Sequence, residues 1–285
     1  MDTLLILALN GLIWGLIIAL IALGLSIIFC LLDVINIAHG DFFMLGSIFA
    51  WFTIQYTGNF WIAILIVPVI GFGLGALCEF FVIRPIKNAA ALTIVATFGL
   101  SIFLQESVRA TYGAAPKRLM TPINDTFLIF STEYEFYRIF AALFSIVLIS
   151  GFFLFLHKTK IGIWMRAVRF NPEIATAMGI PTKKIYMFTF ALGFALAAQG
   201  GVIAAPITTV DFQSGIDILP FCFMAVIIGG LGNLEGTVAA ALILSTFEGI
   251  VTTFSDPTFA RISSLILMCT ILILRPHGIF SGAKS

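Results

Sequence analysis

The chain has 285 residues, of which 60% are hydrophobic and 10% charged, with a mean hydropathy of +1.12. A soluble globular domain carries about 25% charged residues, so this composition excludes an ordinary soluble protein and predicts a polytopic membrane protein. The formal net charge of +1 is uninformative as a total. We expect no nucleic-acid partner.

Hydrophobic runs divide the chain into candidate membrane spans. A span needs about 20 mostly apolar residues, and about eight to nine runs of this kind predict an all-α transmembrane helix bundle that forms a single domain over residues 1–285. The first run lacks a basic leader and a cleavage site, so we expect no removable signal peptide. The expected spans are 8–31, 37–55, 60–83, 91–109, 136–156, 185–205, 214–231, 236–254 and 258–276.

The distribution of basic residues predicts the orientation in the membrane. Lys and Arg accumulate on the cytoplasmic side. With the N-terminus outside and the C-terminus in the cytoplasm, ten of the fifteen basic residues become cytoplasmic, namely Arg84, Lys87, Lys158, Lys160, Arg166, Arg169, Lys183, Lys184, Arg275 and Lys284. The segment 157–184 is then cytoplasmic. On the opposite side, the loop 110–135 is long enough for a short surface helix or a hairpin.

Polar residues open the second span, in DVINIAHGDFFMLGS at 33–47. Polar and ionisable groups at membrane depth are costly unless they are paired or hydrated. On a helix, Asn36, His39 and Phe43 would share one face, which could line a polar path. Alternatively, the segment lies at the cytoplasmic interface, where these groups are hydrated or cap the helix.

A polar stripe runs along the fourth span, where Thr93, Thr97, Ser101 and Gln105 recur every four residues. Such side chains can bind a polar solute without fixed charge, or they can join helices through interhelical hydrogen bonds. From both segments we select Asn36, His39, Thr97 and Ser101 as residues that line a solute pathway.

Catalytic and metal-binding motifs are missing. The sequence contains no GxxxxGK[ST] loop, no HExxH and no GxSxG. The four cysteines show no paired spacing that would indicate a metal site. We therefore expect no enzyme activity, no catalytic residue, no metal and no cofactor bound by this chain.

The segment 157–184 is polar and basic, between two hydrophobic runs. Asn171 and Pro172 suit the N-cap and first turn of a short helix, Glu173 complements its dipole, and Gly179 with Pro181 ends it. A short helix of small side chains at this place fits a groove in a partner protein. The alternative is an amphipathic linker that lies on anionic lipid.

Several stretches together resemble the permease subunits of branched-chain amino acid ABC importers of the LivH type. They are GLSIIFCLLDVINIAHGDFFMLGS at 24–47, RPIKNAAALTIVATFGLSIFLQ at 84–105, residues 165–206 from MRAVRFNPE to GGVIAAP, IGGLGNLEGTVAAALIL at 228–244 and LRPHGIFSG at 274–282. Their order and spacing extend over almost the whole chain.

The resemblance implies a multi-pass subunit in the cytoplasmic (inner) membrane of a bacterium or archaeon that works by alternating access. It pairs with a second homologous permease subunit, binds two cytoplasmic ATPase subunits that carry ATP and magnesium, and receives solute from an external solute-binding protein. The coupling helix of such permeases falls on residues Arg169, Glu173, Ala175, Ala177, Met178, Gly179 and Ile180.

Alternatives remain at this stage. Importers of urea or short amides have related permeases with the same motifs. A channel or a secondary carrier would need no ATPase, and a structural membrane protein would carry no solute flux.

Overall fold

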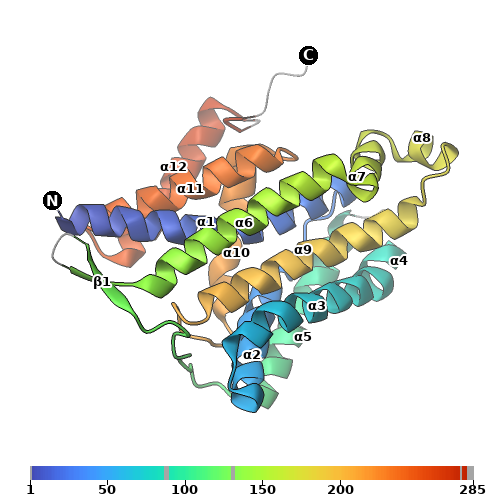
Figure 1. The fold of residues 1–285 in the computed structure, drawn as a ribbon. Coiled ribbons are helices and arrows are strands. Elements are labelled where there is room, and N and C mark those ends of the chain that lie inside the picture. The colour runs from blue at the N-terminus through green and yellow to red at the C-terminus, as the bar shows by residue number, and fades with distance from the viewer. Residues whose placement is uncertain (1, 87–89, 130–131, 277, 281–285) are drawn as a thin grey trace.

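The computed structural model describes residues 2–86, 90–129, 132–276 and 278–280. These residues form a helical bundle with one short hairpin (Figure 1). The elements are α1 (Asp2–Leu32), α2 (His39–Thr57), α3 (Phe60–Cys78), the π-helix η1 (Glu79–Ile83), α4 (Arg84–Ile86), α5 (Ala90–Tyr112), β1 (Thr126–Ile129), β2 (Thr132–Glu135), α6 (Phe136–Lys158), α7 (Lys160–Phe170), α8 (Pro172–Ala177), α9 (Thr182–Ala204), α10 (Ser214–Gly229), α11 (Leu234–Val251) and α12 (Pro257–Leu274).

The expected all-α membrane bundle is confirmed. Within the described ranges, seven helices are long and apolar enough to cross a membrane: Leu5–Leu32, Phe60–Ile86, Ala91–Tyr112, Phe136–Lys158, Thr182–Ala204, Leu234–Val251 and Pro257–Leu274. The other two expected positions hold α2, which begins with His39 and contains Asp41, and α10, which has only 16 residues. Both helices cross the bundle at a steep angle to α1 and α9 (Figure 1).

Helices α1 and α9 form the centre of the bundle. Residues 17–25 of α1 are almost completely buried, and α9 packs against α1, α2 and α3. Glycines allow this close packing, because a Cβ atom at Gly193 of α9 would lie 2.7 Å from the carbonyl oxygen of Gly24 in α1. In lipid, helices associate through such close backbone contacts.

Two other glycine pairs also allow close helix packing. Gly11 and Gly15 contact α11 around Ser245, and Gly71 and Gly75 contact α9 around Phe194 and Ala198. By contrast, α5 and α12 expose most of their apolar side chains, including Phe103 and Ile266.

The two ends of the bundle differ in chemistry. The N-terminus and the β1–β2 hairpin lie at one end, and α7 and α8 lie at the other (Figure 1). The hairpin pairs Thr126 with Glu135 and confirms one of the two forms expected for the loop 110–135. The end that carries α7 and α8, the α8 end, has the basic residues Lys158, Lys160, Arg166, Arg169, Lys183 and Lys184.

The α8 end also holds the last described residues of the chain. The Ile279 N–H donates to the Ile228 carbonyl at 2.8 Å, and the Asn233 side-chain amide donates to the Phe280 carbonyl at 2.7 Å. Lys87 and Lys284, which we counted as cytoplasmic, lie outside the described residues. That the α8 end faces the cytoplasm stays a prediction from the basic residues.

The glycine contacts predict different stabilities for two glycine-to-alanine variants. Gly46→Ala should destabilise the protein by about 1–3 kcal/mol, because its Cβ would overlap the backbone of Ala198 and push α2 from α9. Gly73→Ala is the control, since nothing lies within 4 Å of its Cβ position. Thermal unfolding in detergent measures both, and equal midpoints would contradict the packing role.

Candidate functional site

The chain between α1 and α2 is not helical. α1 ends at Leu32, and Asp33 has a left-handed backbone with φ of 54°, a conformation that Asp tolerates better than most residues. Residues 33–38 then lead to α2, which begins at His39. The prediction that Asn36 shares a helix face with His39 is therefore wrong, because this turn ends the helix before Asn36.

This non-helical segment, the 33–38 break, runs into the interior of the bundle. The His39 Nε2 atom lies 2.9 Å from the carbonyl oxygen of Ile21, which is in the middle of α1. Asn36 and His39 are completely buried, whereas Asp33 is exposed. Burial contradicts the interfacial alternative for Asn36 and His39, whereas for Asp33 it stays a prediction.

The polar stripe of α5 faces the break. The Ile37 N–H donates to Thr97 Oγ1 at 3.2 Å, and the Thr97 hydroxyl donates to the Ile94 carbonyl at 3.1 Å. Thr97 therefore supplies a partner to a backbone group that no helix satisfies. In a membrane interior such a group would otherwise cost several kcal/mol.

Two turns further along α5, the stripe meets a carboxylate. The Gln105 side-chain amide donates to Asp41 Oδ1 at 2.8 Å and to Ser101 Oγ at 2.9 Å. Asp41 is 1% exposed and belongs to the first turn of α2. α5 is thus joined to α2 by hydrogen bonds, as the helix-joining interpretation of the stripe predicted.

The same three residues line a cavity of about 250 Å³ between α5 and α10, the Asp41 crevice. Its other walls are Ile37, Phe98, Ile102, Gly215, Ile216 and Leu219. Phe98, Ile102 and Ile216 are exposed, so the crevice opens on an apolar outer face of the bundle. A polar floor under apolar walls can hold a small amphipathic solute.

Further along α10, toward the α8 end, lies a separate apolar cavity of about 180 Å³, the Phe29 pocket. α10 contributes Phe223, Val226 and Ile227 to it, and these follow Ile216 and Leu219 of the crevice on one helix face. Leu25, Phe29, Val34, Ile35 and Leu231 complete the lining.

Of the four residues predicted to line a pathway, Ser101 lines the crevice and Thr97 supports the break beside it. Asn36 and His39 are buried in and next to the break and do not line the crevice. Asp41 and Gln105 were visible in the sequence but not selected. The α10 wall gave no sequence signal, because its residues are ordinary apolar ones.

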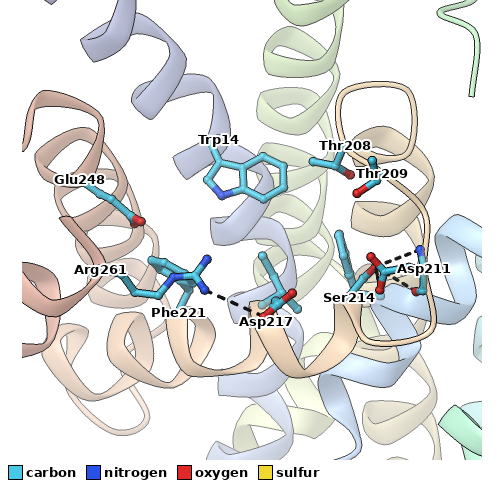
Figure 2. A pocket seen from close by; sticks show the side chains of 11 residues that line it. Trp14, Thr208, Thr209, Asp211, Ser214, Asp217, Phe221, Glu248 and Arg261 are labelled. Atoms are coloured by element: carbon cyan, nitrogen blue, oxygen red, sulfur yellow. Dashed lines mark hydrogen bonds and ion pairs between the residues drawn. The ribbon is translucent and has the colours of Figure 1, made fainter. Parts of the chain in front are cut away.

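The opposite face of α10 lines a second polar cavity of about 180 Å³, the Trp14 pocket (Figure 2). Glu248 and Arg261 lie on one side of it and Thr208, Thr209 and Asp211 on the other, with Trp14 between them (Figure 2). Phe43, Ser214, Asp217, Ile218 and Phe221 complete the lining.

Both signs of charge meet in the Trp14 pocket. Arg261 Nη1 lies 3.9 Å from Asp217 Oδ1, and the guanidinium lies 5.2 Å from the centre of the Phe221 ring. Glu248 is half-buried in the last turn of α11, where the helix dipole disfavours a negative charge. Carboxylates, a guanidinium and hydroxyls beside aromatic rings can bind both ends of a small zwitterion.

The predicted short helix is present as α8, with the predicted caps. Asn171 Oδ1 accepts hydrogen bonds from the N–H groups of Glu173 at 3.0 Å and Ile174 at 2.9 Å, and Pro172 is the first helical residue. Gly179 follows with φ of 84° and ends the helix. α7 precedes it and is held against the bundle by buried Met165 and Val168.

Large apolar side chains of α7 and α8 are exposed at a polar end of the protein, including Ile163 and Trp164 of α7 and three at or beside α8. Phe170 is 88% exposed, Ile174 56% and Met178 78%, and together they form the α8 apolar patch. Phe170 and Ile174 were missed by the sequence analysis, which followed small residues.

The residues predicted for coupling differ in their exposure. Arg169, Glu173, Ala177, Met178 and Gly179 are exposed, whereas Ile180 is half-buried and Ala175 is 3% exposed. The side chain of Ala175 therefore packs toward the bundle and does not face a partner.

The cap predicts a local effect. Asn171→Ala should destabilise α8 by about 1 kcal/mol, because two helix N–H groups lose their partner. Amide hydrogen exchange in residues 173–178 should become roughly fivefold faster, while Asn171→Asp keeps the cap and the rate. Equal exchange in both variants would contradict a capping role.

Known proteins resemble this chain over most of its length. Residues 7–274 match the family described as "Branched-chain amino acid transport system / permease component". The chain is 27% identical to the high-affinity branched-chain amino acid transport system permease protein LivH of Salmonella typhimurium, over 95% of this chain and 93% of that protein. It is 26% identical to the probable branched-chain amino acid transport permease protein LivH of Methanocaldococcus jannaschii, over 95% and 90%.

A shorter similarity extends to a sugar transporter. The galactofuranose transporter permease protein YtfT of Escherichia coli is 29% identical over 47% of this chain and 42% of that protein. No solved structure gives a significant match.

Proposed function

This chain belongs to the family of branched-chain amino acid transport permease components, and we propose that it is the membrane subunit of an ATP-driven importer of branched-chain amino acids. As a permease it is a transport subunit and not an enzyme. ATP and magnesium then bind to separate ATPase subunits, and the protein works in the cytoplasmic (inner) membrane of a bacterium or archaeon.

The observation that carries the ATP-driven part of the proposal is the α8 apolar patch. Phe170, Ile174 and Met178 are exposed at a basic, polar end of the protein, and a groove in a partner would bury them. α8 is capped at both ends and α7 is anchored in the bundle, so a force on the patch reaches the membrane helices. We assign this patch to an ATPase subunit.

A second permease subunit fits the apolar face around the Asp41 crevice. Val95, Phe98 and Ile102 of α5 are exposed there, and the crevice between them has polar groups that lipid would not satisfy. A second subunit on this face would close the crevice into a path between the two permeases.

Solute would enter from the end opposite to α8, where an external solute-binding protein docks. The Trp14 pocket offers both charges for the head group of an amino acid, and the Asp41 crevice and the Phe29 pocket continue along the other face of α10. Alternating access then requires α10 to move relative to α2 and α5.

The docking role predicts the effect of removing the patch. Phe170→Ser combined with Met178→Ser should weaken binding of the ATPase subunits of the same importer at least roughly thirtyfold, since the loss of one buried interface anchor of about 2 kcal/mol already corresponds to this factor. Co-purification and binding-protein-stimulated ATP hydrolysis measure the loss.

Met120→Ser is the matched control, because Met120 is 92% exposed and lies outside α7 and α8. Its binding to the ATPases should be unchanged. Normal ATPase binding by the Phe170 and Met178 variant would show that ATPases dock elsewhere.

A further inference from the structure

Asp41 is a buried carboxylate without a basic partner in the described part of the chain. It is 1% exposed, and its carboxylate accepts hydrogen bonds from two neutral side chains, the Gln105 amide and the Ser101 hydroxyl. The described ion pairs of the chain involve other acids, namely Glu79, Glu106, Glu135 and Asp217. A buried charge of this kind is costly unless a cation compensates it.

The space beside Asp41 has the shape of a site for such a cation. Asp41, Ser101 and Gln105 supply oxygen atoms and an amide on one side of the crevice. The remaining walls are apolar and include Phe98, Ile102 and Leu219. A bare metal ion would make no contact with the apolar walls. An organic ammonium ion with an apolar chain would contact both the polar side and the apolar walls of the crevice.

The carboxylate is also held in a fixed position. Gln105 donates to Asp41 and to Ser101 at once, so hydrogen bonds connect the three side chains. Gly215 of α10 passes so close to Asp41 that a Cβ there would lie 2.8 Å from Asp41 Oδ1. A side chain at position 215 would therefore collide with the carboxylate, which lines the crevice beside Gly215.

We propose that Asp41 binds the ammonium group of the transported solute, whose branched apolar chain lies against Phe98, Ile102 and Leu219. The proposal rests on the proposed function, because it takes the crevice as part of the solute path. Binding by Asp41 would make the permease itself selective for primary ammonium compounds over neutral amides and urea. The reason is that a hydrogen bond between two charged groups is stronger than one between neutral groups.

The test uses the purified complex of both permeases and the ATPases, in detergent and without the binding protein. The probes are 3-methylbutylamine, which carries the ammonium group and a branched chain, and 3-methylbutanamide, its neutral analogue. We expect only the amine to raise the melting temperature of the complex. An equal shift with the amide, or no shift with the amine, would overturn the proposal.

The Asp41→Asn variant tests whether the amine raises the melting temperature by binding at Asp41. It removes the negative charge and keeps a hydrogen-bond acceptor for Gln105. It should abolish the shift caused by the amine and reduce leucine uptake into proteoliposomes at least roughly tenfold. Glu106→Gln, an exposed neighbour on α5, should behave as the wild type. An amine shift that survives in Asp41→Asn would place the ammonium site elsewhere.

Failure of the proposed function would look different. A wild-type complex without binding-protein-stimulated ATP hydrolysis and without leucine uptake would contradict an importer, whatever the amine does. The amine and amide comparison decides the role of Asp41 independently of that result.

Discussion

Every backbone N–H and C=O group inside a bilayer needs a partner within the protein, and the 33–38 break is the place where this requirement shapes the molecule. The break leaves the α1 helix at Asp33 and returns into the bundle, where Thr97 accepts the Ile37 N–H. Because α2 then begins beside Ile21, its polar first turn lies in the interior of the bundle. The position of Asp41 against α5 follows from this arrangement.

Helix α10 gives the interior its two different cavities. Ile216 and Leu219 face the Asp41 crevice, whereas Asp217 and Phe221 face the Trp14 pocket, as expected for opposite sides of one helix. α10 has 16 residues and contains Pro220, so it is shorter than a full span and lacks one helical hydrogen bond. A displacement of this helix would open one cavity while it narrows the other.

Features with local causes could be predicted from the sequence. The cap at Asn171 depends on residues two and three positions away, and the four-residue spacing of Thr97, Ser101 and Gln105 places them on one face of any helix. Features with tertiary causes could not be predicted. Asn36 was expected in a helix because nothing nearby indicates the turn at Asp33, and the partner of Asp41 is 64 residues away.

At the α8 end, the proposed ATPase contact lies close to two elements of the proposed solute path, the 33–38 break and α10. Arg169 near the end of α7 and Pro172, the first residue of α8, share a cavity of about 320 Å³ with Asp33, Leu231 and Gly232. Asp33 begins the break that leads to Asp41, and Leu231 follows the end of α10. A movement of α8 would therefore act on residues next to the break and next to the end of α10, and Ile37 of the break and Ile216 of α10 both line the crevice. The Arg169 guanidinium also packs beside Gly232, and contacts of this kind provide the physical connection that a force from an ATPase needs to change access to Asp41.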